Sequence, residues 1–551
     1  MPVPNPNAPS RILNGTSVRT KLATDDKDPP APAQNPNSDE SLFDKVGTYS
    51  KGLKQDGKGL VNPAAFQGFR TVIDAAEPIP GAHDFSVVMM GGGRKLNGPQ
   101  GAFAAQLTCK DSAQFGTMTV PEAPGVGSPE YAVELVELYW ASLLRDVPFA
   151  EYEANPIAIA AAAELNIPAY KDHYAGPLDA HGNVTPRVLF RGGFNKGSSI
   201  GPLPKNSRPK YFAGELTGPH LSQFCFVPTN FGAQPIDQKY YTAAPHVDYM
   251  TDPTVWELVQ EGKSADAYPL NKNDRRHLHS GRGLCVYTHE DELYQAYFTA
   301  YLVMKTMGIP LNATSPYRAL NPDTKFKNEQ PFGTFGGADI AATLAAVAKA
   351  ALNAVWYQKW VIHLRHRPES GGGILHYQRD TMHPTSYSAA INHLAINSNA
   401  VVRSMQHNSG SDLLSQAFPE GSPTHPAYPT GHGCVAGACI TALKFFYKGD
   451  TIIPNPVVPT ADGMGLMPYV FDAGDTGVMN VNGELHKLAH NISFGHGLHA
   501  GIHWRSDTDY SMLLGEEVAV NFLEEQVKSY SEKVSVTIDL MDGQTQKTFA
   551  N

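Results

Sequence analysis

The chain has 551 residues, of which 42% are hydrophobic and 17% are charged, and its formal net charge is −10. This composition supplies a substantial core and excludes an intrinsically disordered chain. The negative charge argues against nucleic acid or an anionic membrane as the main partner, because both select clustered positive charge. We find no run of 18 or more apolar residues, so the sequence predicts no membrane span.

The N-terminal 41 residues differ in composition from the rest. Residues 1–41 are rich in proline, asparagine and aspartate, and we expect a polar arm that is either solvated or wrapped around a partner subunit. The first residues show no signal-peptide pattern. The localisation therefore stays open between the cytoplasm and export after removal of a signal. Residues 42–551 are expected to form the folded body, with the site within about 337–515.

Apolar periodicity predicts helices joined by long loops. The first strong helix covers residues 128–149, where Ser128 is a candidate N-cap and Pro129 suits the first helical position. Further helices are expected over residues 155–167, 291–310, 336–368, 430–450, 484–507 and 511–530. Alternation around Asp542-Gly543 predicts a β-hairpin. The predicted fold class is mainly α, with packed helical bundles, long loops and a small C-terminal β-hairpin.

The first chemical signal is "KWVIHLRHRP", residues 359–368. Lys359, His363 and Arg367 are spaced four and four, and on one helix they would lie along a slowly drifting face. The flanking residues are apolar, so this face is expected to be partly buried, and buried cations need an anion. A solvated basic face is the alternative interpretation.

The second signal is "PTGHG", which starts at Pro429. Thr430 can cap the helix that begins there, and Gly431 lets an anion approach the backbone N–H groups of the helix N-terminus. His432 can move protons near neutral pH, and His425 lies seven residues earlier. A capped helix with a core histidine is the simpler alternative.

The third signal is "FGHGLHAGIHWRSD", in which Asp507 follows His503 by four residues. A carboxylate at that distance can bind the far nitrogen of a ligating histidine and fix its tautomer. A helix-surface pair is the alternative. His496, His499 and His503 would also allow a zinc or copper site. That interpretation leaves the cations of the first segment unexplained.

In their order and spacing, the three segments resemble the vanadium-dependent haloperoxidases, which share their anion site with the class A acid phosphatases. The separations of Lys359 from Arg367 and of His425 from His432 match the bromoperoxidase branch. "YSKGL" and "ELYWASLLRDVPF" resemble the N-terminal half of that family. The resemblance covers the chain from about residue 40 and implies two four-helix-bundle-like halves and a homo-oligomer.

The resemblance also implies a role for each matching residue. His503 would bind vanadium, His432 would act as acid–base, and His425 is typical of the bromide-oxidising branch. The vanadate oxygens would be held by Lys359, Arg367, the hydroxyl of Thr430 and the N–H of Gly431. Lys359 would also polarise bound hydrogen peroxide.

One departure concerns a third cation. The family carries an arginine six residues before the ligating histidine, where this chain has Gly497. His496 would replace it if the segment contains a one-residue insertion. Without a replacement, the loss of one charge-assisted contact costs about 1.5–3 kcal/mol. If His496 titrates near pH ~6.5, vanadate should bind more tightly as the pH falls.

The implied activity is oxidation of bromide by hydrogen peroxide to hypohalous acid, which halogenates a small organic acceptor. Iodide and chloride are further candidate halides. Two alternatives stay open. One is an acid-phosphatase-like hydrolase in which His503 attacks phosphorus and His432 protonates the leaving group. The other is a scaffold that only binds anions.

Overall fold

The structure is a computed structural model that describes most of the chain. The described residues are 15–18, 20–21, 47–75, 81–104, 120–193, 211–318, 328–380, 391–472, 475 and 477–551. Most of the predicted arm, residues 1–41, therefore lies outside the described residues, as does Cys109. The other four cysteines, Cys225, Cys285, Cys434 and Cys439, are buried free thiols.

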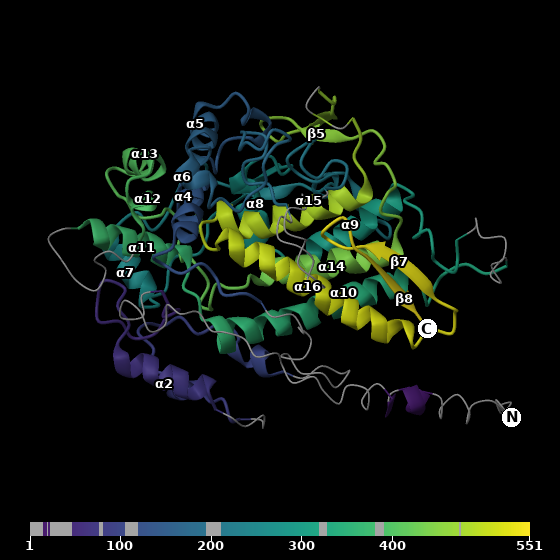
Figure 1. Cartoon of the computed structure of the whole chain (residues 1–551), viewed down its shortest axis with the longest axis horizontal. Helices are drawn as coiled ribbons and strands as arrows, with labels where there is room; N and C mark the ends of the chain where they lie inside the picture. Colours follow the sequence, from purple (N-terminus) through teal and green to yellow (C-terminus); the bar gives the residue numbers. More distant parts are fainter. Residues whose placement is uncertain are drawn as a thin grey trace.

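Helices dominate the described chain (Figure 1). The α-helices are α2 (Pro63–Ile73), α4 (Pro129–Leu143), α5 (Pro156–Leu165), α6 (Pro168–Lys171), α7 (Pro253–Gln260), α8 (Gly281–His289), α9 (Gln295–Thr306), α10 (Gly337–Tyr357), α11 (Pro368–Arg379), α12 (His393–Ile396), α13 (Asn399–His407), α14 (Gly431–Phe446), α15 (Val481–Phe494) and α16 (Arg505–Val527). Short 3-10 turns are η3 (Phe85–Val87), η4 (Pro99–Phe103), η5 (Phe149–Glu151) and η6 (Gln223–Cys225), and two π-helical turns are η7 (Gln358–His363) and η8 (Gly495–His499).

The described strands form small antiparallel pairs. They are β1 (Thr229–Phe231) with β2 (Gln234–Ile236), β3 (Tyr240–Ala243) with β4 (Leu270–Arg276), β5 (Val457–Pro459) with β6 (Leu466–Pro468), and β7 (Ser535–Asp539) with β8 (Gln546–Ala550). The last pair is the predicted C-terminal hairpin. The mainly α fold is therefore confirmed, and Ser128 caps α4 as predicted by accepting from Tyr131 N at 3.1 Å.

The apolar core has two large parts. One joins α9, α10, α14, α15, α16 and the β7–β8 hairpin, and the other joins α4, α5 and the region of α11 to α13. Figure 1 shows the two groups side by side. A smaller cluster packs Phe66 and Phe69 of α2 near Trp360, beside the first chemical segment.

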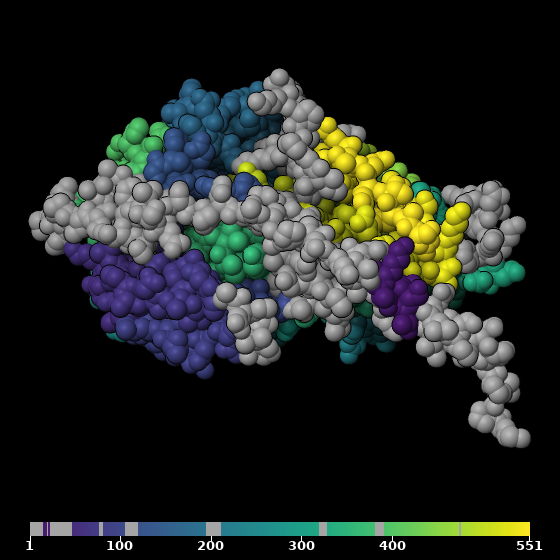
Figure 2. All heavy atoms as spheres, turned by 60° about the horizontal axis from the view of Figure 1, so that its bottom comes forward, coloured from purple at the N-terminus to yellow at the C-terminus, as the bar shows by residue number. Residues whose placement is uncertain are grey.

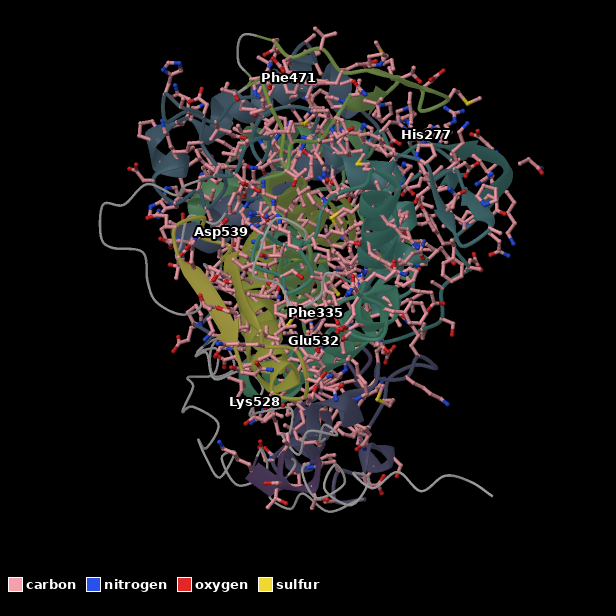
Figure 3. All side chains as sticks on the ribbon, turned by 90° about the vertical axis from the view of Figure 1, so that its right-hand side faces the viewer. His277, Phe335, Phe471, Lys528, Glu532 and Asp539 are labelled. Atoms are coloured by element: carbon pink, nitrogen blue, oxygen red, sulfur yellow. The ribbon has the colours of Figure 1, made fainter. Side chains whose placement is uncertain are left out.

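The outer surface shows the region of α2 as a separate lobe. In Figure 2 this indigo lobe lies at the lower left of the visible face, and the yellow C-terminal residues lie toward the right. Figure 3 shows Phe335 and Glu532 close together, where the start of α10 meets the segment after α16. Tyr317 there donates to Glu532 at 2.6 Å, which ties the C-terminal segment to the body.

Helices α14 and α16 approach most closely through glycine. A Cβ at Gly437 would collide with the carbonyl of Met512, and one at Gly515 would collide with the carbonyl of Cys434. The two backbones are therefore in direct contact. Their N-terminal ends also meet, because the N–H of Thr430 donates to the carbonyl of Asp507 at 3.0 Å.

Two predicted long helices are interrupted. The helix expected over 336–368 ends as α10 at Tyr357, continues as the π-turn η7 and stops at Leu364, whose φ of 46° is left-handed. Lys359, His363 and Arg367 are therefore not on one helical face, and that prediction is wrong.

The helix expected over 484–507 is likewise divided. It consists of α15, the π-turn η8 and a separate helix, α16, that begins at Arg505. A π-turn absorbs one additional residue within a helix. This is the kind of insertion that the position of His496 required.

One segment satisfies the length and composition of a membrane span. Gly337–His363 has a mean hydropathy of 1.4, and 56% of its apolar stretch is buried inside the protein. Ile340, Leu344 and Val347 belong to the same core as α14 and α16. These contacts are those of a core helix.

Candidate active site

The three predicted segments meet beside the N-terminal ends of α14 and α16. Arg367 contacts two of the predicted histidines. Its Nη1 lies 2.7 Å from Nε2 of His503, and its Nη2 lies 3.0 Å from Nδ1 of His425. The π-turn and the left-handed Leu364 turn the chain so that Arg367 still reaches the site without sharing a helix with Lys359.

Lys359 and Arg367 are buried cations without a carboxylate partner among the described residues. Lys359 Nζ donates to the carbonyls of Pro426 and Ala427 at 2.8 and 2.7 Å. Burial lowers the pKa of Lys359 well below its ordinary value, and the nearby Arg367 lowers it further. Burial likewise lowers the pKa of Arg367 to about 10. An anion between the two side chains would relieve both effects.

Thr430 holds an unused hydroxyl at the same place. It is the N-cap residue of α14 by position, yet its Oγ1 is buried and has no hydrogen-bond partner in the described structure. No side chain caps the first turn of α14, which begins at Gly431. The helix N-terminus and the free hydroxyl are therefore both available to an oxyanion.

His503 is oriented by Asp507. The Nδ1–H of His503 donates to Oδ2 of Asp507 at 2.9 Å, and the N–H of Trp504 donates to the same oxygen at 3.1 Å. This pattern assigns the proton to Nδ1, so Nε2 carries a lone pair toward Arg367. Nε2 is therefore the atom that could ligate a metal. Asp507 occupies the third position of α16 rather than the next turn of one continuous helix.

His432 lies at the rim, with its side chain 22% exposed. Its Nε2 is 3.2 Å from both carboxylate oxygens of Asp291, a partner that the sequence analysis missed. Asp291 lies 141 positions earlier, in a segment without a recognisable motif, so no spacing could indicate it. A histidine held by a carboxylate and open to solvent is suited to proton transfer.

His496 stacks on His432, with ring centroids 3.9 Å apart, and its ring lies 5.9 Å from that of His503. The π-turn thus brings His496 to the rim of the site. Burial and the neighbouring imidazoles lower its pKa well below the ordinary value. This argues against the condition that His496 titrates near pH ~6.5, because desolvation and neighbouring positive charge favour the neutral imidazole.

His499 and His363 lie outside this arrangement. The ring of His499 packs 5.5 Å from Phe149 and 5.4 Å from Phe190, and His363 packs edge-on against Tyr428 at 4.7 Å. Across the described ranges, no three or more histidine, cysteine, aspartate or glutamate side chains are grouped to hold a metal ion. The zinc or copper alternative required His499 as a third ligand beside His496 and His503, and His499 does not lie with them.

The fold and the site define a helical protein in which two buried cations and the His503 imidazole lie beside the N-terminal ends of α14 and α16. Residues 339–532 match the family model described as the VCPO second helical-bundle domain. The matched range contains Lys359, Arg367, Thr430 and His503.

Known proteins resemble the chain over almost its whole length. It is 29% identical to a vanadium-dependent bromoperoxidase of Corallina pilulifera, over 93% of this chain and 92% of that protein. It is also 29% identical to one of Ascophyllum nodosum, over 92% and 87% of the two chains. The structure of a second vanadate-dependent bromoperoxidase from Ascophyllum nodosum, described as homohexameric, matches with a TM-score of 0.84 at 25% identity. That match covers 98% of this chain and 92% of the other.

Proposed function

We propose that this protein is a vanadate-dependent haloperoxidase that oxidises bromide with hydrogen peroxide, and that the hypobromous acid formed halogenates small organic acceptors. The observation that carries the proposal is the pair of buried cations, Lys359 and Arg367, which converge beside His503 without a carboxylate partner in the described chain. The relatives named bromoperoxidases support bromide as the halide. Iodide and chloride are the other halides to test.

The residues fit vanadate. A multiply charged oxyanion needs several donors and no competing carboxylate, and vanadium needs one nitrogen ligand. The oxygens would be held by Lys359, Arg367, the Thr430 hydroxyl and the N-terminus of α14, and Nε2 of His503 would bind the metal. The buried Thr430 Oγ1, which has no hydrogen-bond partner in the described structure, supports this fit. When bound, vanadate supplies a Lewis acid that keeps one oxidation state.

The protein's own residues then have separate tasks. Lys359, in its desolvated pocket, donates a hydrogen bond to the peroxide oxygen that bromide attacks, which makes that oxygen more electrophilic. His432, held by Asp291, takes up and returns the peroxide proton. The peroxide O–O bond breaks and bromide loses two electrons. One oxygen joins bromide as hypobromous acid, and the other leaves as water after one proton is consumed.

The test uses apoprotein with bromide, hydrogen peroxide and a phenolic acceptor, with and without orthovanadate. We expect bromination that saturates with vanadate and is inhibited by phosphate, because both oxyanions would use the same donors. A rate no faster than that of free vanadate would overturn the proposal. Hydrolysis of an aryl phosphate without bromination would indicate the phosphatase chemistry instead.

We further propose that the protein assembles as a homo-oligomer. The support is the similar structure described as homohexameric, which the chain matches over 98% of its own length. Size-exclusion chromatography with light scattering measures the assembly directly, and a monomer mass at micromolar concentration would contradict it.

A further inference from the structure

A buried arginine lies behind the ligating histidine and was not among the predicted site residues. Arg365 is 1% exposed, and its Nη1 donates to Oδ1 of Asp507 at 2.8 Å. The other oxygen of Asp507 accepts the Nδ1–H of His503 at 2.9 Å. Arg365, Asp507 and His503 thus form a continuous chain that ends at the nitrogen facing Arg367.

Arg365 is itself fixed from several sides. Its Nη1 also donates to the hydroxyl of Ser506 at 2.9 Å, and its Nη2 donates to Oε2 of Glu134 on α4 at 3.2 Å. Glu134 in turn accepts the N–H of Ser506 at 2.7 Å. The guanidinium packs over the ring of Trp504, with its central carbon 4.7 Å from the ring centroid. The position of Arg365 is therefore set by the N-terminal half of the chain as well as by α16.

The position of Arg365 matters because its positive charge compensates the buried carboxylate of Asp507. Asp507 is fully buried, and without Arg365 its Oδ1 would lack the only hydrogen-bond partner that the described structure gives it. A buried carboxylate left in that state loses the bond that fixes its orientation, or attracts another cation. One such cation is Arg367, on the far side of the His503 ring. Either change would disturb the histidine or remove a cation from the anion pocket.

We propose that Arg365 is a positioning residue: it neutralises and orients Asp507, so that His503 presents Nε2 and so that Arg367 and Lys359 stay free for the oxyanion. The inference rests on the proposed function. It assigns different tasks to two arginines that are two positions apart, with Arg367 facing the ligand and Arg365 facing the carboxylate.

The experiment compares vanadate with phosphate as ligands of the apoprotein by isothermal titration calorimetry. Both anions use the cations and the helix N-terminus, but a stable bond to Nε2 of His503 is expected for vanadate alone. The ratio of the two dissociation constants therefore measures how much the bond to His503 contributes to vanadate affinity. Phosphate binding shows that the fold and the cations are intact. Arg365→Lys keeps the positive charge but loses the planar guanidinium and its several N–H donors. Arg365→Met removes both the charge and the donors.

We expect both Arg365 variants to weaken vanadate about 10-fold to 100-fold relative to phosphate. The matched control is Arg505→Met, because Arg505 is equally buried and pairs with Glu137 of α4, yet no hydrogen bond joins it to Asp507 in the described structure. It should leave the ratio unchanged. If Arg365→Met does not fold, Arg365→Lys decides the question.

Two results would be decisive against the idea. A wild-type ratio in both Arg365 variants, or an equal loss in Arg505→Met, would show that Arg365 has only a structural role. Equal affinity of the unmodified protein for vanadate and phosphate would instead overturn the proposed function, and the inference with it.

Discussion

At the scale of single residues, the site depends on which charges are left without a partner. Lys51 pairs with Glu369, Arg365 with Asp507 and Arg505 with Glu137, all buried. Lys359 and Arg367 make no such pair among the described residues. Buried cations are costly unless an anion accompanies them. Lys359 and Arg367 also lie beside His503, so we expect an anionic ligand there.

The role of His503 can be separated from that of the cations. His503→Ala removes the candidate metal ligand and leaves Lys359, Arg367 and Thr430 in place. We expect bromination to fall to the rate of free vanadate, while phosphate binds within about threefold of wild type because its donors remain. A bromination assay and a phosphate titration measure the two effects. Retained vanadate-dependent activity would exclude His503 as the ligand.

Substitution of His496 tests whether a third cation at this position would strengthen vanadate binding. Its pKa is lowered by burial, so it stays neutral between pH 8 and 6 and adds no charge as the pH falls. His496→Arg should strengthen vanadate binding about tenfold, because arginine remains charged in a buried site. His496→Ala should weaken it if the imidazole donates a hydrogen bond.

The measurement is the vanadate dissociation constant at pH 8, 7 and 6, with phosphate as the reference anion. In wild type we expect no pH dependence from His496 beyond that of vanadate itself. If wild type and both variants have the same vanadate dissociation constants at each pH, His496 lies outside the binding site.

At the scale of elements, the π-turns and a glycine contact position the site. Lys359 lies in the turn η7 and His496 in the turn η8, and each π-turn shifts the helical phase of the residues that follow it. The start of α14 is held against α16 because Gly437 and Gly515 let the two backbones touch.

Substitution of Gly437 tests this contact. Gly437→Ala would push its Cβ into the carbonyl of Met512, and we expect it to lower the free energy of unfolding by about 1–3 kcal/mol through overpacking. The control is Gly68→Ala in α2, where a Cβ meets nothing within 4 Å. There we expect a gain of about 0.5–1 kcal/mol, because alanine loses less backbone entropy in a helix. Urea unfolding measures both, and equal effects would contradict the close contact.

At the scale of the whole molecule, buried histidines control stability in acid. Burial lowers the pKa of His363, His366 and His499 to about 3 and that of His490 to about 4. The unfolded chain binds these protons below pH ~6.5, and the folded protein does not. Stability is therefore lost as the pH falls from 6.5 toward 4.

Two buried carboxyls oppose this trend. Burial raises the pKa of Glu215 and Glu516 to about 7, so the folded protein holds protons that the unfolded chain loses above its lower pKa. As the pH falls, the four histidines reduce the free energy of unfolding by more than the two carboxyls raise it. We expect the free energy of unfolding to fall by at least about 2 kcal/mol between pH 6.5 and 5. His366→Gln should flatten the slope by up to ~1.4 kcal/mol per pH unit, and a flat wild-type curve in urea unfolding would contradict the argument.

The sequence by itself determined the helices with local start signals and the C-terminal hairpin, and it indicated most of the residues that we propose for the site. Ser128 before Pro129 marks the start of α4, and the order of residues around Lys359, Thr430 and His503 predicts the chemistry, because each pattern depends on near neighbours. Only the tertiary structure decided where the long helices break and how the site residues are supported. The π-turns, Asp291 beside His432 and Arg365 behind Asp507 depend on contacts between segments far apart in the chain. Those contacts follow from packing and charge pairing in the folded state, which leave no local periodicity to read.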